Sequence, residues 1–232
     1  MSSSVIVALD FESQAEALAL VESLGEDADF YKVGLQLLTE AGPEIVKDLV
    51  SKGKHVFLDL KIHEIPNSVA GAVAAAGRLG ATMVTVHASG GVAVLRAAVE
   101  AANAFPQLKV LAITVITSLT DSDLPSIGLA PSVRQQVLRL ASLAAQAGCH
   151  GVVASAQEAA VLKVLLPVGS LIVTPGIQLP DSIANDQARI AKPDFAARAG
   201  STHVVMGRAI TKAVAPQLAY ATAQSLFLSG KE

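Results

Sequence analysis

Three charged side chains fall within six residues of one another at the end of an apolar stretch. Asp59, Lys61 and Glu64 follow the run at 55–58 and precede Pro66. An apolar run of this length that ends close to a proline is typical of a buried strand. Because side chains alternate along a strand, Asp59 and Lys61 are expected on the same side, about 7 Å apart along the chain.

The chemistry open to such a pair is that of a positioned cation. Burying a charge costs several kcal/mol unless it is paired, so a carboxylate and an ammonium held side by side at a strand end indicate a functional site. A fixed ammonium can stabilise developing negative charge and then supply a proton. The alternative is an ion pair that only solubilises a loop, and such pairs are common and weak.

The elements that must position this pair form a repeated unit of a strand followed by a helix. Strands are predicted at residues 5–9, 30–33, 56–60, 83–86, 110–115, 151–154, 171–173 and 203–206. Helices are predicted at residues 12–24, 43–51, 68–79, 91–104, 132–147, 156–166 and 211–227. This alternation implies parallel strands joined by helical crossovers.

Eight strands that alternate with helices in 232 residues predict a closed (β/α)8 barrel that forms a single domain over residues 1–232. The alternative is an open doubly wound sheet, but no Gly-x-Gly-x-x-Gly turn follows the first strand. Active sites of such barrels lie at the C-terminal ends of the strands. The polar residues at these ends are Asp10, Lys32, Asp59 with Lys61, His87, Thr117, Ser155, Thr174 and Arg208. Taken singly, His87 and Ser155 are interpreted as ordinary hydrogen-bonded strand ends.

A phosphate-binding site is predicted near the last two strands. The connection at residues 176–190 is polar, contains Pro180 and lacks helical periodicity, which favours a functional lid. Barrels frequently bind phosphate with the loops that follow strands seven and eight. Gly207 permits close approach of the backbone, and Arg208 offers a bidentate fork for a phosphate dianion.

Composition excludes several other classes of function. Aromatic residues make up 3% of the chain, the net charge is −3 and no basic run exists, so nucleic-acid binding is not expected. No apolar segment reaches the length of a membrane span, and the N-terminus lacks the features of a signal peptide, so we expect a cytoplasmic protein. The single cysteine, Cys149, excludes an internal disulfide and is interpreted as a packing residue. The five histidines are dispersed, so no metal site is expected.

The segment from Asp59 to Asn67 resembles the Asp-x-Lys-x-x-Asp signature of the orotidine 5′-phosphate decarboxylase family. Further segments match the pattern of that family in order along nearly the whole chain; they lie at residues 7–10, 32–34, 86–91, 114–118, 173–177 and 207–208. The resemblance implies a barrel enzyme that decarboxylates orotidine 5′-monophosphate to uridine 5′-monophosphate and CO2 without a cofactor. It also implies a homodimer in which the carboxylate at the position of Glu64 is lent to the neighbouring subunit's site.

The resemblance further implies roles for individual residues. Lys61 would donate the proton to the pyrimidine C6, flanked by Asp59 and Glu64, and Lys32 would complete an alternating charged network. The ribose would contact Asp10 and Lys32, the pyrimidine would contact Thr117 and Ser118, and the phosphate would contact Gln187, Gly207 and Arg208. The remaining substrate-binding positions would be Leu60, Ile62, His63, Ile65, Pro66, Asn67, Ser68 and Gln178.

Three positions depart from the pattern of the family, and two other functions stay open. Glu64 replaces an aspartate, Gln178 stands where related bacterial enzymes often carry an arginine, and Ser68 replaces a threonine. One alternative is a metal-dependent decarboxylase or aldolase of the same barrel group that acts on a sugar phosphate. The other is a barrel that binds a phosphate ligand and has lost its chemistry through Glu64.

Overall fold

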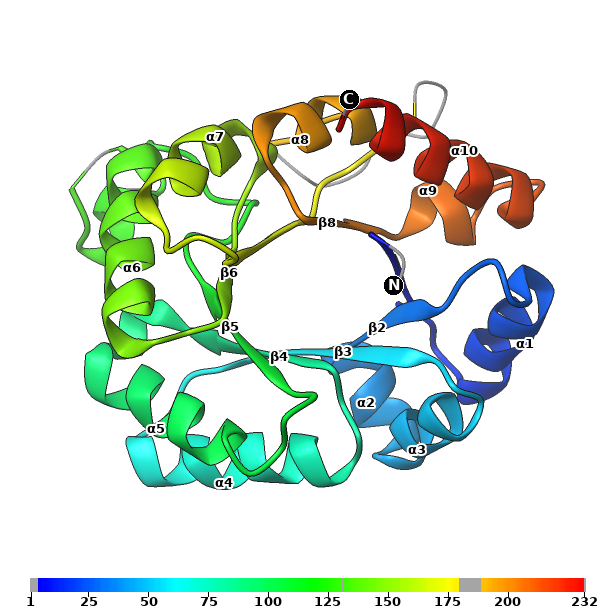
Figure 1. The fold of residues 1–232 in the computed structure, drawn as a ribbon, viewed down its shortest axis with the longest axis horizontal. Coiled ribbons are helices and arrows are strands. Elements are labelled where there is room, and N and C mark those ends of the chain that lie inside the picture. The colour runs from blue at the N-terminus through cyan, green and yellow to red at the C-terminus, as the bar shows by residue number, and fades with distance from the viewer. Residues whose placement is uncertain (1–3, 131, 180–188, 232) are drawn as a thin grey trace.

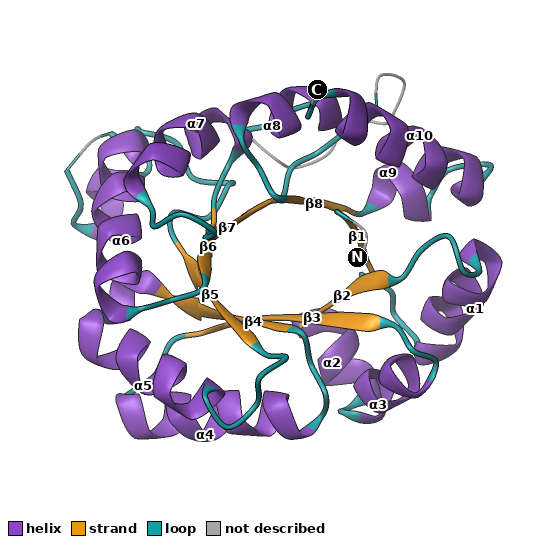
Figure 2. Cartoon of the chain, in the orientation of Figure 1, coloured by secondary structure: helices purple, strands orange, loops and turns teal. Residues whose placement is uncertain are grey.

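The computed structural model describes residues 4–130, 132–179 and 189–231. Within these ranges, eight parallel strands close into a barrel in the order β1 to β8, and helices surround it (Figures 1 and 2). This confirms the predicted (β/α)8 barrel over an open sheet. None of the described helices combines the length and the apolar character that a membrane span requires.

The strands agree with the prediction to within a few residues at each end. They are β1 (Val5–Ala8), β2 (Phe30–Gly34), β3 (His55–Ile62), β4 (Met83–His87), β5 (Lys109–Ile113), β6 (Gly151–Val153), β7 (Leu171–Thr174) and β8 (His203–Met206). The helices are α1 (Gln14–Leu24), α2 (Leu35–Ala41), α3 (Glu44–Ser51), α4 (Pro66–Arg78), α5 (Val92–Ala102), α6 (Val133–Ala147), α7 (Ala156–Leu165), α8 (Pro193–Ala199), α9 (Arg208–Thr211) and α10 (Pro216–Ser229).

The helix predictions need three corrections. The helices α2 and α8 were missed because each has only seven residues, too few to establish a helical period. The helix expected at 211–227 is two helices, since α9 ends at Thr211 and a new helix begins at Pro216. Proline is well suited to this first position, because the amide hydrogen that it lacks would have no partner within the helix.

The barrel has two apolar layers. A small cluster fills its interior and takes members from most of the strands, namely Ile6, Ala8, Phe30, Phe57, Met83, Leu111, Val173 and Val205. A much larger cluster lies between the strands and the surrounding helices, and it includes Leu9, Leu37, Leu49, Leu95 and Phe227. The packed interior closes the barrel from below, so polar side chains at the C-terminal strand ends face a cavity with a solid floor.

Strand β3 is irregular where the charged residues stand. Leu58 pairs with Val84 and Ile62 pairs with Val86, so four steps along β3 match two steps along β4. Two extra residues therefore bulge out of the pairing in the segment that holds Asp59 and Lys61. Bulges of this kind re-aim side chains next to active sites.

Candidate active site

A cavity of about 670 Å³ opens at the C-terminal ends of the strands. Its floor is made by apolar residues of the barrel interior, among them Ala8, Phe57 and Val205. Its wall contains eight residues that the sequence singled out: Asp10, Lys32, Asp59, Lys61, Thr117, Ser118, Gly207 and Arg208. The strand-end residues that were predicted to act together therefore share one cavity.

The pair at the end of β3 is held by a third residue. The Lys61 ammonium donates to Asp59 Oδ2 at 2.5 Å, and the hydroxyl of Thr85 donates to Asp59 Oδ1 at 3.0 Å. The same hydroxyl accepts the backbone N–H of Lys61 at 2.8 Å. Asp59 is 9% exposed and Thr85 is fully buried. Both oxygens of the carboxylate are thus fixed, and the lysine is fixed at both its backbone and its side chain.

The backbone of Lys61 takes an uncommon conformation. Its φ is +48°, in the left-handed region that residues other than glycine rarely adopt. Strain of this kind is concentrated at functional sites. Lys61 and Asp59 do lie on the same side, as the alternation of a regular strand predicts. The strand is not regular here, however, and the bulge and the backbone turn at Lys61 bring its ammonium back to Asp59.

We expect Thr85→Val to lower about tenfold the kcat of a reaction that uses the Asp59–Lys61 pair, while the barrel stays folded. Valine keeps the shape of the side chain but leaves Asp59 Oδ1 and the Lys61 N–H without their partner, and each such loss costs about 1–3 kcal/mol. Steady-state kinetics together with thermal unfolding would measure both effects. Thr114→Val is a matched control, because the buried Thr114 hydroxyl donates only to the Val153 carbonyl, at 2.8 Å. An unchanged kcat in Thr85→Val would show that this hydroxyl does not orient the pair.

A second ion pair lies on the neighbouring strands. The ammonium of Lys32, a residue only 9% exposed, donates to Asp10 Oδ1 at 2.8 Å. Gly34 makes room for it, because a Cβ there would lie 3.1 Å from the Lys32 ammonium and 3.3 Å from Asp10 Oδ1. The structure therefore gives two separate pairs, Asp10 with Lys32 and Asp59 with Lys61, on adjoining parts of the cavity wall.

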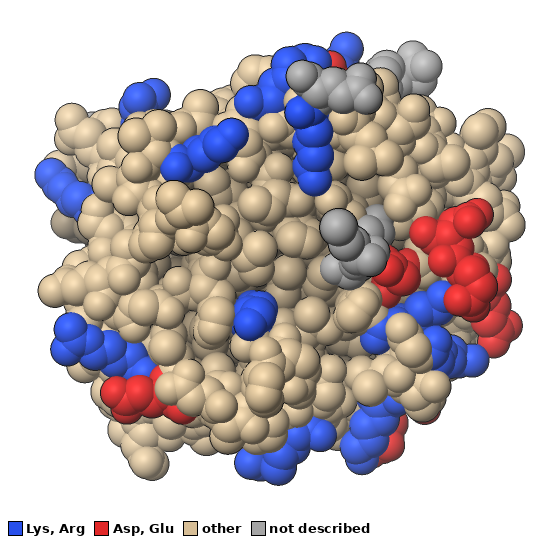
Figure 3. Space-filling view, in the orientation of Figure 1, with Lys and Arg blue, Asp and Glu red and all other residues tan. Residues whose placement is uncertain are grey.

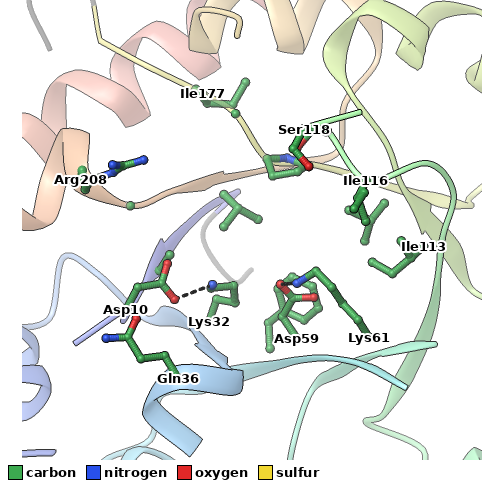
Figure 4. A pocket seen from close by; sticks show the side chains of 18 of the residues that line it. Asp10, Lys32, Gln36, Asp59, Lys61, Ile113, Ile116, Ser118, Ile177 and Arg208 are labelled. Carbon is green, nitrogen blue, oxygen red and sulfur yellow. Dashed lines mark hydrogen bonds and ion pairs between the residues drawn. The ribbon is translucent and has the colours of Figure 1, made fainter. Parts of the chain in front are cut away.

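The arginine after β8 and the lysine after β3 stand at opposite ends of the cavity. Figure 4 shows Arg208 at one end, Lys61 at the other, and Lys32 with Asp10 between them. Ile177 and Ser118 form the facing wall. Figure 3 shows the opposite face of the barrel, at the N-terminal ends of the strands, where basic side chains are scattered and acidic ones gather at the edge where α1 lies. The cavity thus suits an elongated ligand with an anionic group at the Arg208 end.

Comparison with known proteins identifies the family of this chain. A sequence profile described as "Orotidine 5'-phosphate decarboxylase / HUMPS family" matches residues 3–223. The chain belongs to this family. A relative from Laribacter hongkongensis named orotidine 5′-phosphate decarboxylase is 50% identical over 215 residues, which cover 92% of this chain and 88% of the relative. One of the same name from Chromobacterium violaceum is 47% identical over 93% of this chain and 87% of its own.

A solved structure shows the same fold over nearly the whole chain. The crystal structure of orotidine 5′-phosphate decarboxylase from Lactobacillus acidophilus superposes with a TM-score of 0.87 at 35% identity. The match covers 97% of this chain and 99% of that one. Family membership therefore rests on both sequence and architecture.

Several residues that the family resemblance assigns to the substrate do not line the cavity of this single chain. Residues 63–68, which include Glu64 and Ser68, are all exposed, and the Glu64 carboxylate accepts the N–H of Ile65 at 2.8 Å. Gln178 lies outside the wall, and its side-chain nitrogen is buried without a partner among the described residues. Leu60 and Ile62 are also absent from the wall. Gln187 and most of the expected lid at 176–190 lie outside the described residues, so their roles stay predictions.

Four other residues singled out by the sequence lie outside the cavity wall and make contacts with neighbouring parts of the fold. Ser155 accepts the N–H of Gln157 and caps α7, and the Thr174 hydroxyl bonds that of Ser201 at 2.7 Å. The His87 ring centroid lies 5.4 Å from that of His63, with the two rings tilted by 36°, and burial, followed by the neighbouring His63 and Lys61, lowers the pKa of His87. Cys149 packs beside the core, and burial raises the pKa of its thiol to about 12, which agrees with a packing role.

Sequence reasoning missed a buried ion pair behind the cavity wall. The guanidinium of Arg189 donates to both oxygens of Glu158, at 2.9 and 3.0 Å, and to the Val115 carbonyl at 3.3 Å. Arg189 is 9% exposed and Glu158 is 5% exposed. Val115 lines the cavity, so this pair fastens the wall after β5 to α7 and to the chain that returns from β7. A hint in the sequence was Glu158, which stands on the buried face of α7.

We expect Glu158→Ala to lower the free energy of unfolding by about 3–5 kcal/mol. The change leaves the Arg189 guanidinium buried without its carboxylate, which is the costly way to break such a pair. Urea unfolding followed by circular dichroism would measure it. Asp194→Ala is the matched control, because it removes the more exposed Asp194–Arg198 pair and should cost about 1 kcal/mol or less. Equal losses in the two variants would contradict a structural role for the buried pair.

No group of three or more His, Cys, Asp or Glu side chains within the described ranges is arranged to hold a metal ion.

Proposed function

We propose that this chain catalyses decarboxylation of orotidine 5′-monophosphate to uridine 5′-monophosphate and CO2, the last step of de novo UMP biosynthesis. One observation carries the proposal: the Asp59–Lys61 pair and Arg208 stand at opposite ends of one cavity. A nucleoside monophosphate has the matching layout, with a reactive ring at one end and a phosphate at the other. Membership of the family and the names of the relatives support the same activity.

Decarboxylation leaves a negative charge on C6 in the plane of the ring. When the bond between C6 and the carboxylate breaks, the electron pair stays on C6, where the π system cannot delocalise it. The Lys61 ammonium, fixed by Asp59 and Thr85, would stabilise this carbanion electrostatically and then donate its proton to C6. The lysine would regain a proton from water after CO2 has left.

The rest of the cavity would hold the substrate in register with Lys61. The Asp10–Lys32 pair, midway along the wall, suits the ribose hydroxyls. Thr117 and Ser118 line the wall after β5 and suit the polar edge of the pyrimidine. Gly207 and Arg208 suit the phosphate. Binding energy from this remote phosphate can serve to orient the ring against Lys61.

We further propose a homodimer in the cytoplasm, with active sites at the interface between the subunits. The exposed segment at residues 63–68 directly follows the catalytic strand and carries Glu64 away from its own cavity. Ile65 within it is 62% exposed, which is unusual for a large apolar side chain and suits burial against a second copy. In such a dimer Glu64 would complete the partner's site beside Lys61 and Asp59.

The decisive experiment is to mix the purified protein with orotidine 5′-monophosphate and follow the loss of orotate absorbance. We expect rapid decay that is unaffected by added EDTA. Decay that stops with EDTA would point instead to a metal-dependent member of the same barrel group. An absence of decay, with uridine 5′-monophosphate still bound, would show a barrel that kept its ligand and lost its chemistry.

A further inference from the structure

The charged side chains of the cavity wall do not balance. Within the described ranges the wall holds four cationic residues and two acidic ones: Lys32, Lys61, Arg208 and Lys212, with Asp10 and Asp59. Each acid is hydrogen-bonded to one lysine, in the pairs Asp10–Lys32 and Asp59–Lys61. The four positive and two negative charges leave a surplus of two positive charges on the described wall.

These two residues stand at the two ends of one short segment. Arg208 begins α9, and Lys212 directly follows its last residue, with the Lys212 N–H bonded to the Arg208 carbonyl at 3.0 Å. Side chains four positions apart on a helix lie on the same face. The segment is therefore built to present two cations to the same end of the cavity, next to the backbone of Gly207.

The surroundings of Lys212 leave its charge available to a ligand. No described carboxylate lies within 4.0 Å of its ammonium, whereas Lys32 and Lys61 each have one within that distance. The ammonium lies 5.8 Å from the centroid of the Phe11 ring. Such a contact steadies the side chain without neutralising its charge.

We propose that Lys212 is a second phosphate-binding cation, which with Arg208 matches the two negative charges of a phosphate monoester. This inference rests on the proposed function, which places the phosphate at this end of the cavity. Sequence reasoning missed Lys212 because it follows the Gly207-Arg208 motif by four residues and resembles any surface lysine. The residue would select phosphate esters over the corresponding nucleosides, and it would not take part in the chemistry at C6.

The test compares two ligands that differ only in the phosphate. Binding of uridine 5′-monophosphate and of uridine is measured by calorimetry for the wild type, Lys212→Met and Lys212→Arg. We expect Lys212→Met to weaken binding of the monophosphate roughly tenfold, as for loss of one charge-assisted contact, and to leave uridine unchanged. Lys212→Arg should restore most of the affinity. Higher ionic strength should reduce the difference between wild type and Lys212→Met.

Lys52→Met is the matched control, because it removes one positive charge from an exposed residue at the end of α3, outside the cavity wall. Unchanged affinity of Lys212→Met for the monophosphate, or an equal loss for both ligands, would overturn the inference. Decarboxylation is assayed separately with the wild type, and ribose 5-phosphate serves as a second probe. A wild type that is inactive yet binds ribose 5-phosphate through Lys212 would refute the proposed function alone. A wild type that binds neither phosphate ester would overturn both.

Discussion

Replacement of Lys61 by alanine is expected to lower kcat for orotidine 5′-monophosphate by about 10⁴-fold or more while the affinity for uridine 5′-monophosphate changes little. The ammonium would act twice, as the charge that stabilises the carbanion and as the acid that protonates it. General acid catalysis contributes about 10²–10⁴-fold, and a preorganised electrostatic donor contributes about 10²–10³-fold. The product has a neutral C–H at C6, so its binding does not need this charge.

Single-turnover measurements on Lys61→Ala, together with calorimetry of product binding, would separate chemistry from binding. Lys52→Ala is the control for loss of a lysine outside the cavity. Lys61→Arg keeps the positive charge but is a poor acid, so any activity that it retains beyond alanine would report the electrostatic part alone. Normal turnover in Lys61→Ala would remove this residue from the mechanism and leave the cavity without its proposed proton donor.

The sequence carried enough information for the barrel because the alternation of apolar strands and helices is recognisable in most of its units. Apolar strands alternate with helices, and the polar residue that ends each strand must lie at one rim once the strands are parallel. That reasoning brought Asp10, Lys32, Asp59 and Arg208 into one cavity, as the structure shows. It could not give the helices α2, α8 and α9, because a helix of one or two turns leaves no periodic signal.

The contacts that fix the site depend on tertiary pairing, which no local pattern encodes. Thr85 is one polar residue inside β4, and only the bulge in β3 brings Asp59 and the Lys61 N–H to its hydroxyl. Arg189 and Glu158 are 31 positions apart and meet only because the chain after β7 returns over α7. These residues position others, and their chemistry is no different from that of ordinary core threonines and ion pairs.

Glu64 gives the second large expected effect, because the proposal requires it to act in the site of the neighbouring subunit. Glu64→Ala should lower kcat at least about 100-fold by removing a charge beside the partner's lysine. Glu64→Asp should keep most of the activity, since the charge survives at a slightly shorter reach. In the single chain Glu64 is exposed, and among the described residues its carboxylate accepts a hydrogen bond from the N–H of Ile65 in its own loop, so a purely local role predicts a much smaller loss.

A mixed dimer distinguishes a shared site from a local one. Lys61→Ala and Glu64→Ala chains, each expected to have about 1% of wild-type kcat or less as a homodimer, would be co-expressed with different affinity tags and purified as the heterodimer. If Glu64 crosses the interface, one of the two sites combines an intact Lys61 with an intact Glu64, and about half of the wild-type activity should return. A heterodimer of Lys61→Ala with Asp59→Ala is the control, because both residues lie in the same cavity of one chain and neither site can be complete. Failure of the first heterodimer to regain activity, with the dimer intact, would confine Glu64 to its own subunit and reject the shared site.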